Sequence, residues 1–260
     1  MSGKFYPQSA RSLNEQIAGF VNGNPAKTSA LGAIIPHAGY IYSGRVAAQT
    51  LSRIIPRKKV VILGPNHSGL GGPFSIFNQG NWRTPLGEVA VDEDLAAKLL
   101  DRCGQLSADM LAHQFEHSIE VILPFLQYFF KEFTVIPITC QSQGLAAYQK
   151  LAGDMAHVLK YEKDTLIIAS SDMTHYEPDS LARKKDRQAI ESIVRLDEEE
   201  LIKKTKTQHI TMCGTATVPI MLALTKQLGA SKAEVVLYET SAAASGDTSS
   251  VVGYLGAIIS

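Results

Sequence analysis

The chain has 260 residues, 45% of them hydrophobic, which suits a single large globular domain and excludes a disordered chain. Its 25 Lys and Arg residues balance its 25 Asp and Glu residues, so we expect no broad basic field for nucleic acid or for an acidic membrane surface. The three cysteines are too few for a disulfide framework, and no apolar run has signal-peptide or membrane-span character, so we expect a cytoplasmic protein with no membrane contact.

Helical and strand-like patterns alternate along the sequence. In chain order, they predict a helix over 11–22, a strand over 31–36, a helix over 44–55, a strand over 59–64, an irregular segment over 73–91, helices over 92–103 and 116–131, a strand over 133–140, a helix over 145–160, a strand over 164–171, helices over 178–195, 197–206 and 213–229, and strands over 233–240 and 251–259. Asp92 and Asp197 are predicted N-caps. Trp82, in the irregular segment, is either a packed loop anchor or part of a pocket rim.

This alternation predicts an α/β fold. The strands are continuous apolar runs rich in Val and Ile, which is typical of strands buried on both faces. We therefore expect one domain over residues 1–260, with a central mixed or mostly parallel sheet flanked by helices on both faces.

Residues that handle metals or protons follow four of the predicted strands. These residues are His37, His67, Cys140, and Asp172 with His175. The carboxyl ends of parallel strands meet at one edge of a sheet, where ligands bind in open α/β folds. The sequence therefore predicts a site at this edge, which Cys140 could also line.

The residue types indicate a transition-metal site. Neutral imidazoles of His37 and His67 suit Zn, Cu, Fe or Ni. Cys213 is predicted at a helix start, where the thiolate that binds metal is favoured, although a free cysteine is more often a small buried apolar residue. Asp172 could orient a histidine or complete a metal shell, and His175 could act as a general acid or base. The alternative for this pair is an N-cap and a surface histidine.

A short motif offers a second, hydrolytic interpretation. Residues 113–117 match the H-x-x-E-H pattern, in which His113 and His117 would share a helix face and bind zinc, with Glu116 as base. The predicted helix begins near Glu116, so His113 precedes it, which weakens the peptidase hypothesis. Glu116, His117 and Glu120 remain candidate pocket residues in either case. The sequence has neither a phosphate-binding glycine loop nor a G-x-S-x-G elbow.

Taken in order, the motifs resemble those of the Memo family. They are Pro36-His37-Ala38-Gly39-Tyr40-x-Tyr42-x-Gly44, Gly64-Pro65-Asn66-His67, Glu116-His117-Ser118-Ile119-Glu120-x-x-Leu123-Pro124, Ser170-Ser171-Asp172-x-x-His175, Cys213-Gly214, and the closing Asp247-x-x-Ser250-Val251-x-x-Tyr254-x-Gly256-Ala257. The likeness spans nearly the whole chain. In bacteria and archaea such proteins are called AmmeMemoRadiSam system protein B, and the resemblance implies a radical-SAM enzyme and an AMMECR-type protein as partners.

The resemblance also implies a fold and a ligand set. The family is similar in fold to class III extradiol dioxygenases, which bind Fe(II) through two His and one Glu. By this resemblance His37 and His67 are metal ligands, and Cys213 replaces the Glu. His175 matches the acid/base histidine, while Asp172 and His117 line the pocket. Fe(II) is then the expected metal, copper is an alternative and zinc is possible.

Two main hypotheses about function follow. The first is a metal-dependent oxidoreductase, or an accessory protein of a radical-SAM-linked system, whose pocket takes a small molecule or a modified peptide. The second is a non-catalytic binding module that uses the same pocket for a peptide or partner protein. The sequence leaves open whether the protein is an enzyme, and the zinc hydrolase is a third, weaker hypothesis.

Overall fold

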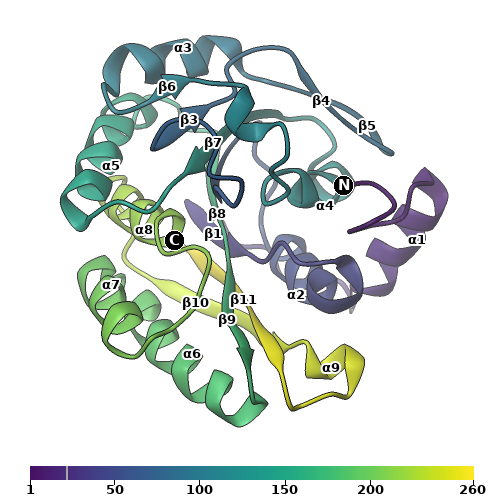
Figure 1. Cartoon of the computed structure of the whole chain (residues 1–260). Helices are drawn as coiled ribbons and strands as arrows, with labels where there is room; N and C mark the ends of the chain where they lie inside the picture. The colour runs from purple at the N-terminus through teal and green to yellow at the C-terminus, as the bar shows by residue number, and fades with distance from the viewer. Residues whose placement is uncertain (22) are drawn as a thin grey trace.

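A mixed β-sheet runs through the centre of the molecule and carries helices on both faces (Figure 1). The computed structural model describes residues 1–21 and 23–260. Within them, the sheet has nine strands in the order β10-β11-β1-β8-β2-β7-β3-β6, with β9 paired to β11. The strands are β1 (Gly32–Ile35), β2 (Lys59–Pro65), β3 (Phe74–Ile76), β6 (Ser107–Ala108), β7 (Thr134–Cys140), β8 (Thr165–Ser170), β9 (Asp172–Glu177), β10 (Ala233–Thr240) and β11 (Val251–Ile259). This arrangement confirms the predicted fold class.

The centre of the sheet is parallel, and antiparallel pairings adjoin it on both sides, at β11 and at β3. Strand β8 pairs in parallel with both β1 and β2, and β2 pairs in parallel with β7. Strand β11 runs antiparallel to β1, β9 and β10. Strands β1, β2 and β8 therefore all end at the same edge of the sheet, as the parallel arrangement required.

Helices cover the sheet on both faces. They are α1 (Ala10–Gly19), α2 (Tyr40–Ser52), α3 (Glu93–Arg102), α4 (Leu123–Phe130), α5 (Leu145–Leu159), α6 (Asp179–Val194), α7 (Glu198–Thr207), α8 (Thr217–Gln227) and α9 (Ala242–Ser245), with short 3-10 helices η1 (Leu111–His113) and η2 (Glu120–Ile122). Within the described residues, no helix combines the length and the apolar character needed to cross a membrane.

Two hydrophobic clusters form the core, one on each face. Along β1 and β2, alternate side chains enter opposite clusters: Ile34 packs with α3, α5 and α8, whereas Ala33 and Ile35 pack with α1, α2 and α4. This alternation follows from the period of two along a strand. It explains why successive residues in the middle of the central strands are apolar.

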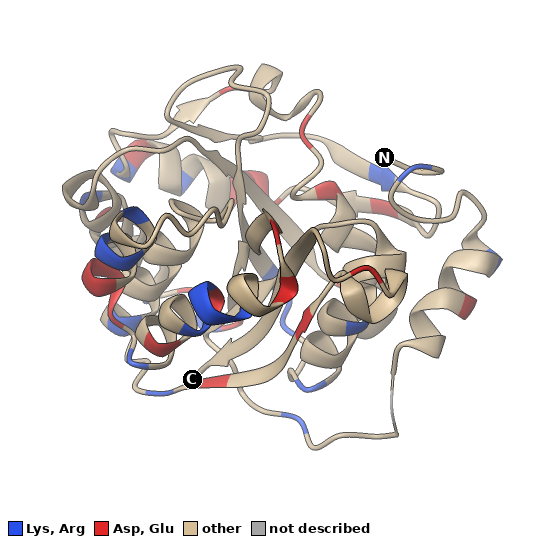
Figure 2. Cartoon of the chain, turned by 60° about the horizontal axis from the view of Figure 1, so that its bottom comes forward, with Lys and Arg blue, Asp and Glu red and all other residues tan. Residues whose placement is uncertain are grey.

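Many of the charged residues lie on helices. In Figure 2, basic and acidic segments alternate along the helices. Helix α7 begins with acidic residues and ends with Lys204 and Lys206, the distribution that the helix dipole favours. The predicted N-caps are confirmed, because Asp92 and Asp197 accept hydrogen bonds from the backbone N–H groups of Leu95 and Glu200.

Several predicted boundaries were wrong. Helix α2 begins at Tyr40, with Gly39 as its N-cap, so the start predicted at 44 was late. The helix predicted over 116–131 is only η2 and α4, because Pro124 stands in the first turn of α4. For the helix predicted over 11–22, the structure shows α1 ending at Gly19, and position 22 lies outside the described residues.

Some strands were not predicted. The segment expected to be irregular contains β3 and the hairpin of β4 (Asn81–Thr84) and β5 (Gly87–Ala90), which are three or four residues long. Strand β9, which carries Asp172 and His175, was also missed. It contains no apolar run, and its pairing with β11 is interrupted by register shifts.

Candidate metal centre

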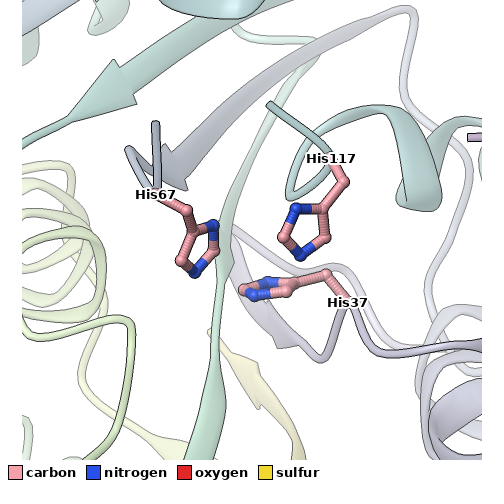
Figure 3. A group of neighbouring side chains, drawn as sticks. All are labelled: His37, His67 and His117. Atoms are coloured by element: carbon pink, nitrogen blue, oxygen red, sulfur yellow. The ribbon is translucent and has the colours of Figure 1, made fainter. Parts of the chain in front are cut away.

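Three histidines from three separate segments meet at the edge where β1 and β2 end. His37 follows β1, His67 follows β2, and His117 lies between η1 and η2. One ring nitrogen from each lies within 4.8 Å of the others, so the group could hold a metal ion. The ring centroids are 5.3 Å apart for His37 and His67 and 4.7 Å apart for His67 and His117. Figure 3 shows the rings around a common space.

The hydrogen bonds of His37 fix which of its two ring nitrogens can bind a metal. Its Nδ1 lies 2.6 Å from the Ser170 hydroxyl oxygen, and that hydroxyl donates its own proton to the carbonyl of Ser118. The hydroxyl must therefore accept from His37, so Nδ1 carries the proton and Nε2 keeps its lone pair. Burial and the neighbouring His67 lower the pKa of His37 to about 3, so the ring is neutral.

His67 is oriented by a carboxylate. Its Nδ1 lies 2.9 Å from Glu116 Oε1, and its backbone N–H donates to Oε2 of the same group at 2.5 Å. Burial opposes ionisation of Glu116, but these bonds and one from the Ser118 backbone lower its pKa to about 2. An ionised Glu116 only accepts, so His67 keeps a proton on Nδ1 and offers Nε2. A carboxylate behind a ligating histidine is common in metal sites.

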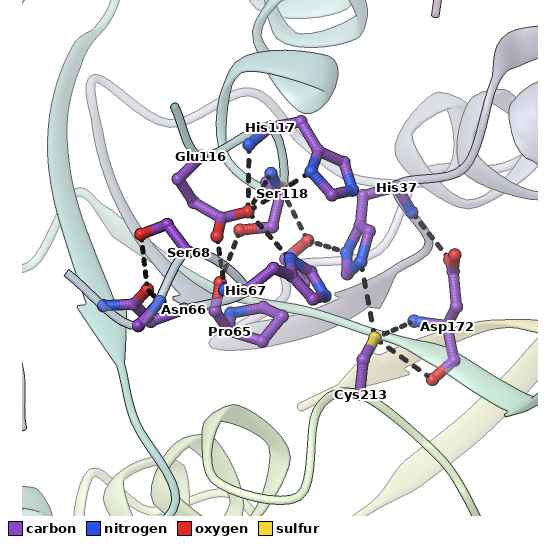
Figure 4. A network of polar contacts seen from close by, with 12 residues as sticks. His37, Pro65, Asn66, His67, Ser68, Glu116, His117, Ser118, Asp172 and Cys213 are labelled. Carbon is purple, nitrogen blue, oxygen red and sulfur yellow. Dashed lines mark hydrogen bonds and ion pairs between the residues drawn. The ribbon is translucent and has the colours of Figure 1, made fainter. Parts of the chain in front are cut away.

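The same carboxylate positions His117. Glu116 Oε1 accepts the backbone N–H groups of both His117 and Ser118 at 2.9 Å (Figure 4). The His117 ring lies between the rings of Phe5 and His67, each with its centroid 4.7 Å away. Burial and the nearby His37 lower the pKa of His117 to about 4. The hydrogen bond and the two stacking contacts therefore hold the His117 ring beside His37 and His67, and its low pKa keeps it neutral.

Cys213 lies next to this cluster. Its Sγ is 3.3 Å from His37 Nε2 and accepts the backbone N–H of Asp172 at 3.0 Å. Sequence spacing alone could not place it there. Helix α8 begins at Thr217, so the prediction of Cys213 at a helix start was wrong. Burial and the charge of Asp172 raise the pKa of Cys213 well above its usual value. Without a metal, the side chain of Cys213 is therefore a thiol.

Asp172 and His175 have different neighbours from those expected. Asp172 Oδ1 accepts the backbone N–H of His37 at 2.9 Å, so it fixes the turn after β1 rather than a histidine ring. His175 Nδ1 lies 2.9 Å from the Thr211 carbonyl oxygen, which therefore orients this ring. Its Nε2 remains available. His175 lies on β9, three residues after Asp172, whose backbone N–H donates to Cys213 Sγ beside the cluster.

Two other candidates lie elsewhere. Cys140 is 2% exposed and belongs to the hydrophobic core. His113 ends η1, where its Nε2 contacts the Ser75 carbonyl oxygen at 3.1 Å. Because no helix runs through residues 113–117, His113 and His117 do not share a helix face. The structure therefore contradicts the H-x-x-E-H hypothesis.

The donor set fits a transition metal. Three imidazole nitrogens and a nearby sulfur are borderline to soft donors, which suit Zn, Cu, Fe or Ni rather than Mg or Ca. Sequence reasoning placed His117 in the pocket, and made it a metal ligand only in the zinc hydrolase hypothesis, together with His113. It also missed Ser170 and Thr211, which fix the protonated nitrogens of two histidines. Ser170 could have been noticed, because it ends a strand adjacent to Asp172.

Known proteins resemble this chain over nearly its full length. A family model described as Memo-like protein matches residues 1–258. The MEMO1 family protein of Aquifex aeolicus is 42% identical over 262 residues, covering 99% of this chain and 97% of the relative. MEMO1 family protein MK0963 of Methanopyrus kandleri is 39% identical over 269 residues, covering 98% of this chain and 95% of the relative.

A solved structure shares the fold. The crystal structure of the uncharacterized protein JW3007 from Escherichia coli K12 matches with a TM-score of 0.58 at 12% identity, covering 87% of this chain and 98% of that chain. At this identity the likeness concerns the fold alone. It agrees with the α/β architecture described above.

Proposed function

Because this chain belongs to the Memo-like protein family, we propose that it binds a redox-active metal ion at His37, His67 and His117. The observation that carries this proposal is the convergence of three imidazole rings whose ligand atoms lie within 4.8 Å of one another. In His37 and His67 the protonated Nδ1 faces Ser170 and Glu116, respectively. The lone pair on Nε2 of each ring is therefore available without a change of tautomer. Such preorganisation lowers the free-energy cost of binding.

Cys213 is proposed as a further ligand, in keeping with the ligand set of His37, His67 and Cys213 that the resemblance implies. Its Sγ lies 3.3 Å from His37 Nε2. Two donors bound to one tetrahedral ion at ordinary N and S bond lengths lie about 3.5 Å apart. The pair is therefore spaced for a shared ion. Binding would remove the thiol proton, since the thiolate is the form that ligates.

Fe(II) is the metal proposed first, with copper as the alternative and zinc as a possible occupant. Iron or copper, when bound, supplies one-electron and O₂ chemistry, so an oxidoreductase is the proposed class of activity. A cysteine donor also favours copper and zinc more than a carboxylate would. Metal identity is therefore the first property to measure.

The chain supplies groups for proton handling beside the ion. His175 keeps Nε2 available while the Thr211 carbonyl holds Nδ1–H, so it can accept or give a proton as the acid/base residue. Asp172 holds the His37 backbone, and Glu116 holds His67 and His117. His175 is thus the proposed catalytic residue. The sequence also suggested catalytic roles for Asp172, Glu116 and His117. In this proposal Asp172 and Glu116 position the metal ligands, and His117 binds the metal.

A binding module is the second candidate function. Large apolar side chains adjoin the site residues in sequence and are exposed: Tyr42 by 40%, Phe115 by 66% and Tyr176 by 79%. Exposed aromatic side chains of this kind suit recognition of a peptide or protein surface. The proposed partners are a modified peptide or small molecule in the pocket and, through the family resemblance, a radical-SAM enzyme and an AMMECR-type protein.

Anaerobic metal competition tests the proposal. Metal-free protein is offered equimolar Fe(II), Cu(I) and Zn(II), and the bound metals are measured by mass spectrometry. The Fe(II)-loaded protein is then treated with nitric oxide and examined by electron paramagnetic resonance, which reports an open position on iron. We expect a bound redox metal and a nitric oxide signal. Zinc alone, or a ferrous protein silent to nitric oxide, would contradict the oxidoreductase proposal and favour the binding module.

A further inference from the structure

A second cavity, separate from the histidine cluster, lies between the β4–β5 hairpin and the segment around η1. Its volume is about 530 Å³, which falls within the range of small-molecule pockets. Residues from Met110 to Gln114 contribute to its wall, and Asn81 to Arg83 contribute from the hairpin. None of its lining residues belongs to the proposed metal centre. Its function is therefore a separate question.

Three aromatic rings form the inner wall of this cavity. Phe77, Trp82 and His113 lie with ring centroids 5.4 to 5.9 Å apart and with planes at 71° to 88° to one another. Met110 and Leu111, which are 46% and 53% exposed, border the same space. The lining is thus mainly apolar and aromatic, as is usual for pockets that take flat organic molecules.

Two nitrogen atoms in this wall lack hydrogen-bond partners among the described residues. They are Trp82 Nε1 and His113 Nδ1, and both are shielded from solvent. His113 Nε2 contacts a carbonyl oxygen, so it carries the proton and Nδ1 is an acceptor. Indole Nε1 is a donor only. A buried donor and a buried acceptor therefore remain unsatisfied on two neighbouring rings, which is costly unless a ligand meets them.

The charged residues of the lining are paired within the described part of the chain. Arg83 contacts Glu88 at 3.0 Å. Glu120 accepts the Tyr6 hydroxyl at 2.6 Å and lies 2.9 Å from the amino group of Met1. The cavity thus offers no excess of either charge. An uncharged ligand fits this balance better than an anion or a cation does.

We propose that this cavity binds an uncharged, planar heteroaromatic molecule whose edge carries a hydrogen-bond acceptor beside a donor. The acceptor takes the proton of Trp82 Nε1, and the donor meets His113 Nδ1. Both residues line the cavity, and binding requires each ring to turn its shielded nitrogen toward the ligand. The ring of the ligand packs against the aromatic wall, which supplies most of the buried area.

Tryptophan fluorescence tests this proposal directly, because Trp82 is the only tryptophan. Adenine is titrated as the probe with acceptor and donor on one edge, beside benzoate and benzyltrimethylammonium as charged aromatic probes. We expect a saturable change with adenine that exceeds the response to either charged probe. Absence of a saturable change with adenine at millimolar concentration, or tighter binding of a charged probe, would overturn the proposal.

Two variants test the assignment of the nitrogen atoms. His113→Phe keeps an aromatic ring but removes the acceptor, so adenine should bind roughly three- to tenfold more weakly. The exposed His157→Phe is the matched control and should bind as the wild type does. Leu111→Arg, at a half-exposed position, should obstruct the cavity even if His113→Phe fails to fold. Equal affinity in the wild type and in every correctly folded cavity variant would exclude this cavity as the binding site.

Discussion

Cys213 Sγ lies 3.3 Å from His37 Nε2, although 176 residues separate the two in the sequence. Asp172 fixes both sides of this contact, because its backbone N–H donates to Sγ and its Oδ1 accepts the N–H of His37. Asp172 is the first residue of β9, a strand that was not predicted from the sequence. It therefore links the Cys213 sulfur to the histidine cluster. The contact makes Cys213 the residue whose replacement should change the metal preference most.

Cys213→Ser should weaken binding of soft metals more than binding of Fe(II). The hydroxyl is a poorer ligand for Cu(I) than a thiolate is, so we expect Cu(I) affinity to fall by roughly tenfold or more. Competition with a chromophoric chelator under anaerobic conditions measures this change. Cys103→Ala, in the core away from the cluster, serves as the control. Unchanged Cu(I) affinity in the Cys213 variant would remove the sulfur from the ligand set.

Glu116→Gln should loosen the cluster without removing a ligand. The amide keeps the shape of the side chain but loses the charge that holds the His67 Nδ1 proton. We expect metal affinity to fall by roughly 10- to 100-fold, as is typical when a carboxylate behind a ligating histidine is lost. Isothermal titration calorimetry with the metal ion measures this affinity. The exposed Glu199→Gln is the control, and equal losses in both variants would show that Glu116 has no special role.

Gly64→Ala should displace the segment that carries His117. A Cβ atom on Gly64 would lie 2.6 Å from Ser118 Oγ and from Ile119 Cγ1, so these residues must move. We expect a loss of roughly 1–3 kcal/mol in the free energy of unfolding, together with weaker metal binding. Gly104→Ala, whose Cβ atom would meet nothing within 4 Å, should cost far less. Urea unfolding compares the two, and equal stabilities would contradict the close packing at Gly64.

The stability of the metal-free protein should fall as the pH is lowered below 6.5. Burial lowers the pKa of His113 to about 4, so between pH 6.5 and pH 4 the unfolded chain binds a proton that the folded protein excludes. Stability is therefore full above pH 6.5 and is lost as the pH falls toward 4. His113 alone should account for about 2 kcal/mol between pH 7 and pH 4.5. Urea unfolding at both pH values should show a smaller difference in His113→Phe; an identical difference would disprove this assignment.

Much of the fold could be predicted because the central strands are buried on both faces. Continuous apolar runs such as residues 60–63 identify strands that are buried on both faces, whatever their neighbours are. The hairpin β4–β5 and strand β9 lack such runs. Their conformation depends on partners distant in the sequence, as in the pairing of Tyr254 with Asp172. Patterns within one segment carry no information about such partners.

The site could be predicted only in part for the same reason. His37 and His67 follow strands, so topology alone brings them to one edge. His117 stands in irregular chain and Cys213 precedes its helix, so neither position follows from a local pattern. The family resemblance implied Cys213 as a ligand. Only the structure shows that His117 stacks on His67.

The central claim is that the three histidines hold one metal ion. Metal content after anaerobic reconstitution with Fe(II) and gel filtration tests it most directly, in the wild type, His37→Ala, His67→Ala and His117→Ala, with the exposed His157→Ala as control. We predict close to one ion per chain in the wild type and in the control, and a large loss in each of the three cluster variants. Full metal content in any folded cluster variant would contradict that histidine's assignment as a ligand, and a metal-free wild type would contradict the claim as a whole.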